Sequence, residues 1–352
     1  MTKNKFEKRL AMVSQKTWAL IAKIDELKGR WVGGTGLSPQ ILGRLKRSVL
    51  MTSSGASTRI EGARLSDEDV EKLMGGMSLN SFADRDKQEV RGYYELLQNV
   101  FDAWKSLRFS ENTMKSLHNE LLKYVEKDAR HKGEYKKGEN NVVMTDADGN
   151  VVSVVFETTR AYLAPKEMQE LTEWTAQAFK EKKYHPLLII SNFIIEFLKI
   201  HPFQDGNGRL SRVLTNFLLL KEGYAYTPYV SHEKLIEDNK SEYYLALRRS
   251  QKTFNGKGDD ITAWLDFFLV VLLRQAENAR DLLSDQNIEK ILSLKQLAVW
   301  RYIESLDEVA PGDIAKQTDI ARPTVNQALE KLLQLKRIER IGLGRSTRYR
   351  KV

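Results

Sequence analysis

The chain has 352 residues, of which 41% are hydrophobic, a composition typical of a soluble globular protein and a length sufficient for two or three domains. It has no cysteine, which excludes disulfides, thiol nucleophiles and cysteine-ligated zinc and is compatible with a reducing cytoplasm. The net charge is +9, and residues 290–352 carry 13 Lys and Arg against 7 Asp and Glu. This last segment therefore indicates an acidic partner, most simply nucleic acid, with solubility as the alternative reason for its charge.

The ends and apolar runs of the chain argue against export or membrane insertion. Residues 1–9 are charged and lack the apolar core of a secretory signal. The most apolar run, 261–273, is too short to span a bilayer and contains Asp266. The sequence thus predicts a cytoplasmic protein with no membrane partner.

Apolar residues recur at three- and four-residue spacing along most of the chain, so we expect a mainly α-helical protein. Residues 1 to about 50 are charged and weakly patterned, apart from one helical stripe of Ile41, Leu42, Leu45, Val49 and Leu50. Ser66 precedes three acidic residues and predicts a helix start, with the serine as cap. Helical patterns continue over 93–104 and 114–125.

A short segment before that cap reads Ser57-Thr58-Arg59-Ile60-Glu61-Gly62. Ser57 and Glu61 are four residues apart and would share one helix face. Gly62 suits the turn that would follow. By itself, the pattern indicates an ordinary short helix.

Residues 142–156 depart from the helical pattern. β-Branched residues lie on both sides of the turn sequence Asp146-Ala147-Asp148-Gly149-Asn150, so the segment predicts a β-hairpin. A lone hairpin is rarely stable by itself, so this one must lie against the helical body. Its exposed edge, at Val142 and Val143, offers backbone groups to an added strand.

The most informative stretch is His201-Pro202-Phe203-Gln204-Asp205-Gly206-Asn207-Gly208-Arg209, continued to Arg212. An apolar run over 187–200 leads into it, and an apolar helical pattern over 210–218 leads out. The stretch is therefore predicted to be a loop between two core helices, with residues 206–208 at the start of the second helix.

The residue types in this loop suit phosphate chemistry. Backbone N–H groups at a helix start attract phosphate, and glycines allow close approach. Arg209 and Arg212 are three apart, so both can point toward the same anion. Asp205 can hold Mg²⁺, and His201 can take a proton at neutral pH. A base, a metal ligand, an anion cradle and a cationic clamp are the parts needed to move a phosphate-bearing group.

Two stretches follow the motif. The adjacent residues Tyr243 and Tyr244 lie on a predicted helix, where one such tyrosine usually packs in the core. Residues 255–258 are glycine-rich but lack the Walker spacing, so we expect a loop there.

The last segment predicts a helix over 294–303, a short helix after Pro311, a helix from about Arg322 to Leu335 and two strands around a glycine-containing tip at 342–344. This order resembles a winged helix-turn-helix. On the recognition helix, the residues placed to reach base edges are Arg322, Thr324, Asn326 and Gln327. On the two strands, the residues placed to meet phosphates are Arg340, Arg345, Arg348 and Arg350. The alternative function of the same domain is dimerisation or docking of a target protein, and the sequence does not favour DNA binding over it.

The pattern His-Pro-Phe-x-Asp-Gly-Asn-Gly-Arg-x-x-Arg at residues 201–212 resembles the signature of Fic-domain proteins at every position. The resemblance implies a helical Fic fold, with the hairpin as a flap over the active site, and transfer of AMP from ATP to a hydroxyl side chain of a target protein. His201 would deprotonate that hydroxyl, and Asp205 would hold Mg²⁺ on the α- and β-phosphates.

The resemblance assigns further residues. Gly206, Asn207 and Gly208 would cradle phosphate oxygens, and Arg209 and Arg212 would bind the β- and γ-phosphates. Tyr243 would lie near the adenine, together with Gln251 where relatives often have asparagine. The flap would hold the target by strand pairing at Val142 and Val143.

The segment from Ser57 to Gly62 is similar to the family's inhibitory motif, Ser/Thr-x-x-x-Glu-Gly/Asn. The resemblance implies that Glu61 pairs with Arg212, the clamp for the γ-phosphate. An Arg–carboxylate pair is strong when shielded, so ATP would bind with its α-phosphate misplaced for attack.

The sequence thus predicts a mainly α protein with three regions: 1–105, helical and carrying the inhibitory motif; 106–285, the Fic catalytic core with its flap; and 288–352, a winged helix. The predicted function is auto-inhibited AMP transfer to a Ser, Thr or Tyr hydroxyl, with self-modification and a homodimer as further expectations. Two alternatives stay open: an AMP-removing enzyme in which Glu61 aligns a water, and a DNA-binding transcriptional regulator whose Fic core is a sensor.

Overall fold

The computed structural model describes residues 4–11, 13–34, 37, 39–75, 85–125, 130–145, 151–254, 258–283, 292–335, 337–342 and 347–352, with the backbone alone at 33–34, 141–145 and 151–156. The chain divides into two compact units, Met1–Leu283 and Ser284–Val352. The division near residue 105 that the sequence suggests stays a prediction. Among the described residues, no helix has the length and apolar character needed to cross a bilayer.

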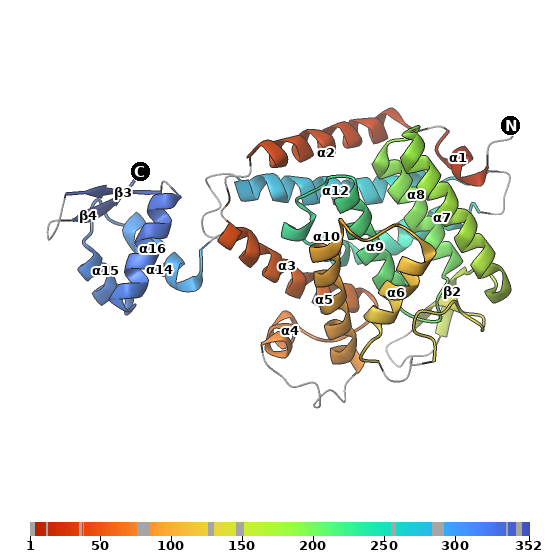
Figure 1. Ribbon diagram of the computed structural model, residues 1–352, viewed down its shortest axis with the longest axis horizontal. Coiled ribbons are helices and arrows are strands. Elements are labelled where there is room, and N and C mark those ends of the chain that lie inside the picture. The colour runs from red at the N-terminus through yellow and green to blue at the C-terminus, as the bar shows by residue number, and fades with distance from the viewer. Residues whose placement is uncertain are drawn as a thin grey trace. The chain divides into compact units, whose positions relative to one another are not determined.

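The first unit is a helical body with one small hairpin (Figure 1). Its elements are α1 Lys5–Arg9, α2 Gln15–Gly34, α3 Pro39–Ile60, α4 Asp67–Met74, α5 Arg85–Ala103, α6 Glu111–Leu121, β1 Asn141–Thr145, β2 Val151–Glu157, η3 Ala161–Leu163, α7 Ala164–Glu181, α8 Pro186–Ile200, α9 Asn207–Lys221, η4 Thr227–Tyr229, α10 His232–Glu237, α11 Lys240–Gln251 and α12 Thr262–Leu283.

The core of this unit is built around α8 and α9. Nearly every side chain of α8 from Leu187 to Ile200 is buried, as the unbroken apolar run requires. α9 is buried from Asn207 to Leu220 apart from Gly208. Two such helices fix the ends of the loop between them, because shifting either would disrupt the close-packed core.

The N-terminal fifty residues correct the sequence-based expectation of weak patterning. Ile21, Ile24, Leu27 and Trp31 recur at helical spacing on α2 and are buried, each with at most 3% of its surface exposed. They pack α2 along α12, as Figure 1 shows at the top of the larger unit. The many charged residues between these positions form the exposed face and hid the stripe.

Several local predictions are confirmed. Ser66 caps α4, and its partner in a capping box is Asp69. Gly62 has φ = +105° and ends the turn after α3. The predicted helix over 114–125 is observed as α6, which ends at Leu121.

The hairpin forms as predicted. β1 and β2 are antiparallel, with Val142 opposite Phe156 and Val143 opposite Val154, and the register shifts between Val142 and Val143. The predicted turn at 146–150 lies outside the described residues, as do 255–257 of the predicted glycine-rich loop.

The second unit has the predicted order of elements: α14 Leu294–Glu304, α15 Pro311–Thr318, α16 Arg322–Gln334, β3 Ile338–Ile341 and β4 Arg348–Lys351. β3 and β4 are antiparallel, and Val309 bridges to Tyr349 as a third short partner. A separate core that includes Val299, Ile314 and Leu329 holds the unit together. The strand tip at 343–346, with Arg345, lies outside the described residues.

Candidate functional site

The predicted loop between α8 and α9 is observed at residues 201–206. His201 ends α8 in the left-handed region with φ = +52°, and Gly206 precedes α9 with φ = +77°. Phe203 is fully buried, and the Asn207 side chain bonds to both its N–H, at 2.9 Å, and its carbonyl, at 2.7 Å. The loop is therefore anchored inward at Phe203.

The loop forms one wall of a cavity of about 230 Å³. The lining residues are Glu61, Asn140, Leu198, His201, Gln204, Asp205, Gly206, Asn207, Gly208, Arg209, Tyr243, Tyr244 and Leu247. The cavity is smaller than the roughly 300–1,000 Å³ of typical ligand sites. Glu61, which reaches in from the end of α3, takes up part of the available space.

His201 is held as a neutral base. Burial lowers its pKa to about 4, so the imidazole is uncharged at neutral pH. Nδ1 lies 3.3 Å from the Leu198 carbonyl, which can only accept, so Nδ1 carries the ring proton. The lone pair is then on Nε2, the arrangement that a general base needs.

His118, on α6, supports the loop from beneath. Its Nδ1 accepts the Gly133 N–H at 3.0 Å, so Nε2 carries the proton and donates to the Asp205 carbonyl at 2.9 Å. The ring stacks on Phe203 with centroids 3.8 Å apart. Burial lowers the pKa of His118 to about 4, which keeps both bonds in place at neutral pH.

The Asp205 carboxylate faces the cavity and is paired with arginines. Its Oδ2 accepts from Arg85 at 2.7 Å and from Arg209 at 3.0 Å. Burial alone would raise the pKa of Asp205, but Arg209 and Arg85 hold it below its usual range. The group is therefore ionised, and an ionised carboxylate facing a cavity is the type of ligand that Mg²⁺ prefers.

Arg212 is bound by three hydrogen bonds to Ser57 of α3 and to Glu61, the residue after this helix. Its Nε donates to Ser57 Oγ at 2.8 Å, and its Nη2 donates to the Ser57 carbonyl at 2.9 Å and to Glu61 Oε1 at 2.7 Å. The Arg212 side chain is 2% exposed and that of Glu61 is 35% exposed. Burial opposes the charge, but Glu61 raises the pKa of Arg212 above its usual value.

The Glu61 carboxylate also lies against the start of α9. A Cβ added at Gly208 would overlap Glu61 Oε1, so only glycine leaves space for this contact. The carboxylate thus occupies the helix N-terminus that sequence reasoning assigned to phosphate.

The expectation that Arg209 and Arg212 bind one anion stays a prediction, and in the structure the two side chains bind different carboxylates. Arg209 Nη1 pairs with Glu89 of α5 at 2.9 Å, and its Nη2 pairs with Asp205, whereas Arg212 pairs with Glu61.

A buried polar cluster fixes α3 beside Arg212. The Glu233 carboxylate accepts from Ser53 of α3 at 2.8 Å, from Tyr93 of α5 at 2.8 Å and from Asn216 of α9 at 2.7 Å. Burial would favour the neutral acid, but His232, Ser53 and other donors lower the pKa of Glu233 to about 2. One ionised side chain therefore ties three helices together around the Glu61–Arg212 pair.

The remaining predicted residues lie at different places. Tyr243 lines the cavity, and burial raises its pKa to about 12; Tyr244 lines it as well and donates to the Ile60 carbonyl at 3.2 Å. Gln251 is not among the described residues that line the cavity. It is buried one turn beyond Leu247 on α11. Of Val142 and Val143 only the backbone is described.

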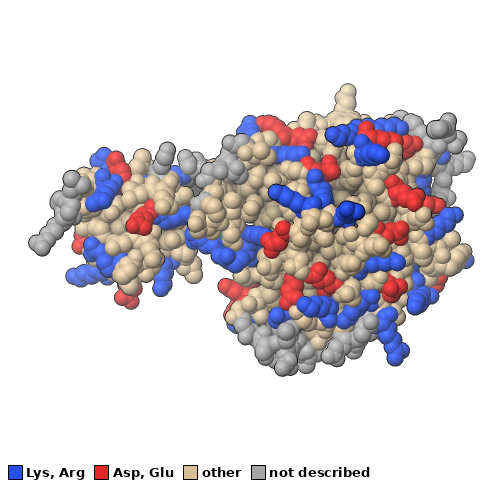
Figure 2. Space-filling model, in the orientation of Figure 1, with Lys and Arg blue, Asp and Glu red and all other residues tan. Residues whose placement is uncertain are grey.

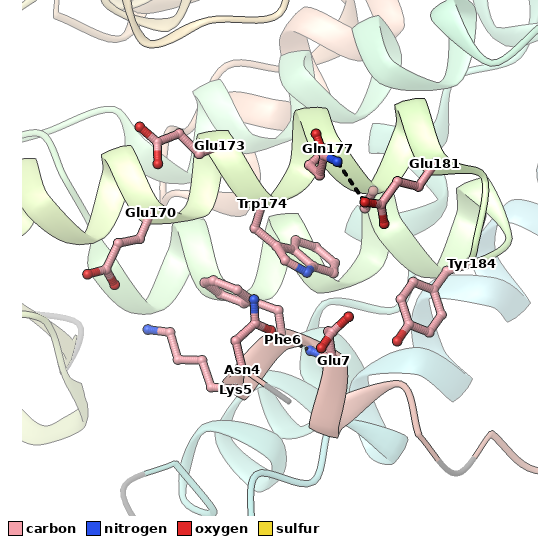
Figure 3. A pocket seen from close by; sticks show the side chains of 11 residues that line it. Asn4, Lys5, Phe6, Glu7, Glu170, Glu173, Trp174, Gln177, Glu181 and Tyr184 are labelled. Carbon is pink, nitrogen blue, oxygen red and sulfur yellow. Dashed lines mark hydrogen bonds between the residues drawn. The ribbon is translucent and has the colours of Figure 1, made fainter. Parts of the chain in front are cut away.

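A larger cavity of about 700 Å³ lies between α1 and α7 and contains none of the predicted site residues (Figure 3). The rings of Phe6 and Trp174 are 5.0 Å apart in its wall, with Glu7, Glu170 and Glu181 around them. We place the candidate functional site in the smaller cavity, because His201, Asp205 and the N-terminus of α9 all line it.

Comparison with known proteins identifies the fold of this site. The Fic/DOC family model matches residues 108–219, and the model described as "Transcriptional regulator DIP2311-like, C-terminal domain" matches residues 293–352. A Fido domain-containing protein from Dictyostelium discoideum is 29% identical over 110 residues, which are 30% of this chain and 72% of that protein. A protein adenylyltransferase Fic from Aedes aegypti is 41% identical over 59 residues.

The chain carries a Fic domain.

Solved structures agree with this Fic fold. A Fic family protein from Desulfovibrio desulfuricans matches with a TM-score of 0.64 and 24% identity over 97% of each chain. A Fic domain containing signaling protein from Bacteroides thetaiotaomicron matches with a TM-score of 0.60 and 24% identity over 73% of this chain and 95% of that one. The predicted mainly α Fic fold with a C-terminal winged helix is thus confirmed.

The chain matches only a small part of the curated adenylyltransferase from Aedes aegypti. The matched segment is 16% of this chain and only 11% of the Aedes aegypti protein, so that protein's activity comes to this chain only as a proposal. The family match begins at residue 108, after Ser57 and Glu61. Roles for the α3 residues therefore rest on the geometry of the pair with Arg212.

Sequence reasoning missed four side chains of the Fic site: Arg85, Glu89, His118 and Lys136. His118 gave a weak signal, because it lies on the apolar face of α6 with Met114, Leu117 and Leu121, where a polar residue needs a buried partner. The other three are charged residues in charged surroundings, and only the fold reveals their partners.

Proposed function

We propose that this chain transfers AMP from ATP to a hydroxyl side chain of a target protein, and that Glu61 holds the site in an inhibited state. The observation that supports this most is the Glu61 carboxylate, which bonds to Arg212 and lies on Gly208 at the N-terminus of α9. An anionic side chain there occupies the place and the partners of a nucleotide phosphate.

His201 would act as the general base. Its neutral ring, with the proton on Nδ1, leaves Nε2 to take the proton of the attacking hydroxyl. The hydroxyl oxygen forms a bond to the α-phosphorus, and the bond from that phosphorus to the pyrophosphate leaving group breaks. The neutral imidazole needs no prior deprotonation near pH 7.

Asp205 would hold Mg²⁺ together with nucleotide phosphates. Among the described residues no group of three or more histidine or acidic side chains is arranged around a metal, so phosphate oxygens would supply the other ligands. The bound ion would neutralise charge on the phosphates. Backbone N–H groups at Gly206 to Gly208 would add hydrogen bonds to the same oxygens.

Glu61 would inhibit by taking the Arg212 clamp. The three bonds from Arg212 to Ser57 and Glu61 satisfy most of its guanidinium donors. A γ-phosphate could gain the clamp only by replacing the carboxylate, so ATP would enter with its α-phosphate misplaced.

The direct test uses α-labelled ATP. Glu61→Gly protein is incubated with cell lysate, and labelled bands are identified by mass spectrometry as AMP on Ser, Thr or Tyr. We expect label with Glu61→Gly and none with the double variant Glu61→Gly/His201→Ala. No labelled protein in any lane, with both variants folded, would refute AMP transfer.

The same geometry keeps AMP removal as a variant of this proposal. Glu61, 35% exposed in the cavity wall, could align a water toward an adenylylated side chain. Release of AMP from a labelled target by wild-type protein, lost in Glu61→Gly, would assign this direction to the site.

DNA binding is a second candidate function, located in the C-terminal unit. On α16, Arg322, Asn326 and Gln327 are exposed, whereas the apolar residues of the same helix are buried in the unit's core. Arg340, Arg348 and Arg350 are exposed on β3 and β4. On the face of the molecule seen in Figure 2, acidic and basic side chains are interspersed over both units. A polar, cationic helix face beside a basic strand pair suits major-groove and phosphate contacts.

A gel-shift series with the full chain tests this candidate. Affinity for a short random duplex should fall about tenfold or more between about 50 and 200 mM salt, because lysine and arginine contacts release counterions. Arg322→Ala should weaken the shift, and the exposed Lys180→Ala on α7 should not. A chain that retains no DNA even at low salt would leave dimerisation or docking as the use of this domain.

A further inference from the structure

A buried polar network that the proposed function leaves unexplained surrounds Lys136, between α6 and β1. The residue is 4% exposed although lysine is almost never buried without partners. Its Nζ donates to Asn140 Oδ1 at 2.7 Å, to Thr158 Oγ1 at 2.8 Å and to the Ile200 carbonyl at 3.2 Å. Three acceptors match the three donors of an ammonium group.

These partners belong to two functional parts of the Fic site. Asn140 directly precedes β1 and Thr158 directly follows β2, so both lie at the base of the hairpin. Ile200 is the last residue of α8, and its carbonyl begins the peptide bond to His201. One ammonium group thus bonds the two ends of the hairpin and the residue before the candidate base.

Backbone and amide bonds extend the same connection. The Lys136 N–H donates to the Pro202 carbonyl at 2.8 Å, and Asn140 Nδ2 donates to the Phe203 carbonyl at 2.8 Å. The Thr159 N–H donates to the Lys199 carbonyl at 3.2 Å. The carbonyls of the residues on both sides of His201 are therefore held by Lys136, which also bonds to the hairpin base.

His201 needs such support. Its φ of +52° is unfavourable for a residue with a Cβ and persists only where the surroundings determine it. Burial lowers the pKa of Lys136 to about 8, so the ammonium is still charged at neutral pH and can keep all three bonds.

We propose that Lys136 is a positioning residue that fixes the His201 loop to the base of the hairpin, so that the segment that would receive the target strand and the candidate base are held as one piece. This inference rests on the proposed AMP transfer for its kinetic consequence. Its structural content, the placement of the His201 ring by Lys136, can be read without any activity.

The test compares Lys136→Met with Lys137→Met. The second change removes the same charge at the adjacent, exposed position and serves as the matched control. Both are made in the full chain carrying Glu61→Gly, and self-modification with labelled ATP gives kcat and the KM for ATP. We expect Lys136→Met to lower kcat about tenfold or more at an unchanged KM, because small displacements of a catalytic group cost that much. Lys137→Met should match its parent.

The second readout is the nitrogen NMR spectrum of ¹⁵N-histidine-labelled protein, with His201 assigned by its loss in His201→Ala. In the parent, His201 should be neutral with the proton on Nδ1. In Lys136→Met its resonances should shift or broaden, while those of His118 stay in place. Unchanged His201 resonances together with a kcat within about twofold of the parent would overturn the proposal.

The role of Lys136 can still be decided if the variant does not fold or if the parent is inactive. If Lys136→Met does not fold, Thr158→Val decides, because it removes one acceptor of Nζ and keeps the lysine; the same His201 shift supports the proposal and an unmoved spectrum refutes it. If the parent transfers no AMP, the proposed function fails, but the His201 spectrum still decides the role of Lys136.

Discussion

The loop that carries His201 and the clamp residue Arg212 belong to one twelve-residue motif, yet different kinds of bond hold them. The loop is held at its carbonyls by Lys136, Asn140 and His118, all through donors that are part of the fold. Arg212 is held by Ser57 and by the Glu61 carboxylate, which is partly exposed to the cavity.

We propose that the loop is a permanent part of the site and that the Glu61–Arg212 pair is an exchangeable one. A nucleotide phosphate, like the Glu61 carboxylate, is an anion with oxygen acceptors, so under this proposal it would replace the carboxylate on Arg212. A nucleotide offers nothing that replaces bonds between loop carbonyls and the protein. We therefore expect the loop to be alike in inhibited and active states and the clamp to change partners.

The largest expected effect comes from the permanent part. His201→Ala should lower AMP transfer by about a thousandfold, because general-base catalysis contributes on the order of 10²–10⁴-fold. ATP affinity, measured by calorimetry, should stay within about twofold, since the base acts on the hydroxyl and not on the nucleotide. Transfer retained in the variant would contradict the assignment of His201 as base.

The next largest effect is expected at His118, which hydrogen-bonds to the loop that carries His201. His118→Phe keeps a ring against Phe203 but leaves the Gly133 N–H and the Asp205 carbonyl without their imidazole partner. We expect the free energy of unfolding to fall by about 2–4 kcal/mol, because each buried unsatisfied group costs ~1–3 kcal/mol. Urea unfolding measures this, with His131→Phe, at a half-buried histidine, as control. A loss of stability no larger than in the control would show that the loop does not depend on His118.

A smaller effect is the pH dependence of stability. His118 and His201 have folded pKa values of about 4, below the unfolded value of 6.5, so the unfolded state binds protons that the folded state does not. Stability is therefore lost as pH falls from about 6.5 toward 4. Each histidine should account for about 2 kcal/mol between pH 7.5 and pH 5. In His118→Phe that loss should be smaller by this amount, and equal slopes would argue that His118 is protonated in the folded chain.

The sequence predicted those parts of the site whose residues are contiguous. The loop at 201–208 could be read because neighbouring residues each had a physical role. The pairing of Glu61 with Arg212, in contrast, was expected only from the resemblance to the inhibitory motif. The helices on either side of the loop followed from apolar spacing. α2 did not, because exposed charges obscured its buried stripe at Ile21, Ile24 and Leu27.

Long-range contacts could not be predicted from the pattern. Lys136 looked like one more lysine in the run from His131 to Glu139, and its burial depends on carbonyls 64 residues away. Arg85 and Glu89 reach the motif from α5, which lies more than a hundred residues earlier. Such partners are set by how α5, α6 and the hairpin pack on α9, and that packing is not local information.

We propose that Glu61 and Arg212 form an exchangeable pair. The decisive measurement is initial AMP incorporation for wild type, Glu61→Gly, Arg212→Ala and the double variant. We expect Glu61→Gly to raise the rate about tenfold or more, because a charge-assisted bond contributes ~1.5–3 kcal/mol. Arg212→Ala should lower it, and the double variant should be as slow as Arg212→Ala, since both changes act on one clamp. A Glu61→Gly rate at or below wild type, with an intact circular dichroism spectrum, or a double variant as fast as Glu61→Gly, would contradict the account.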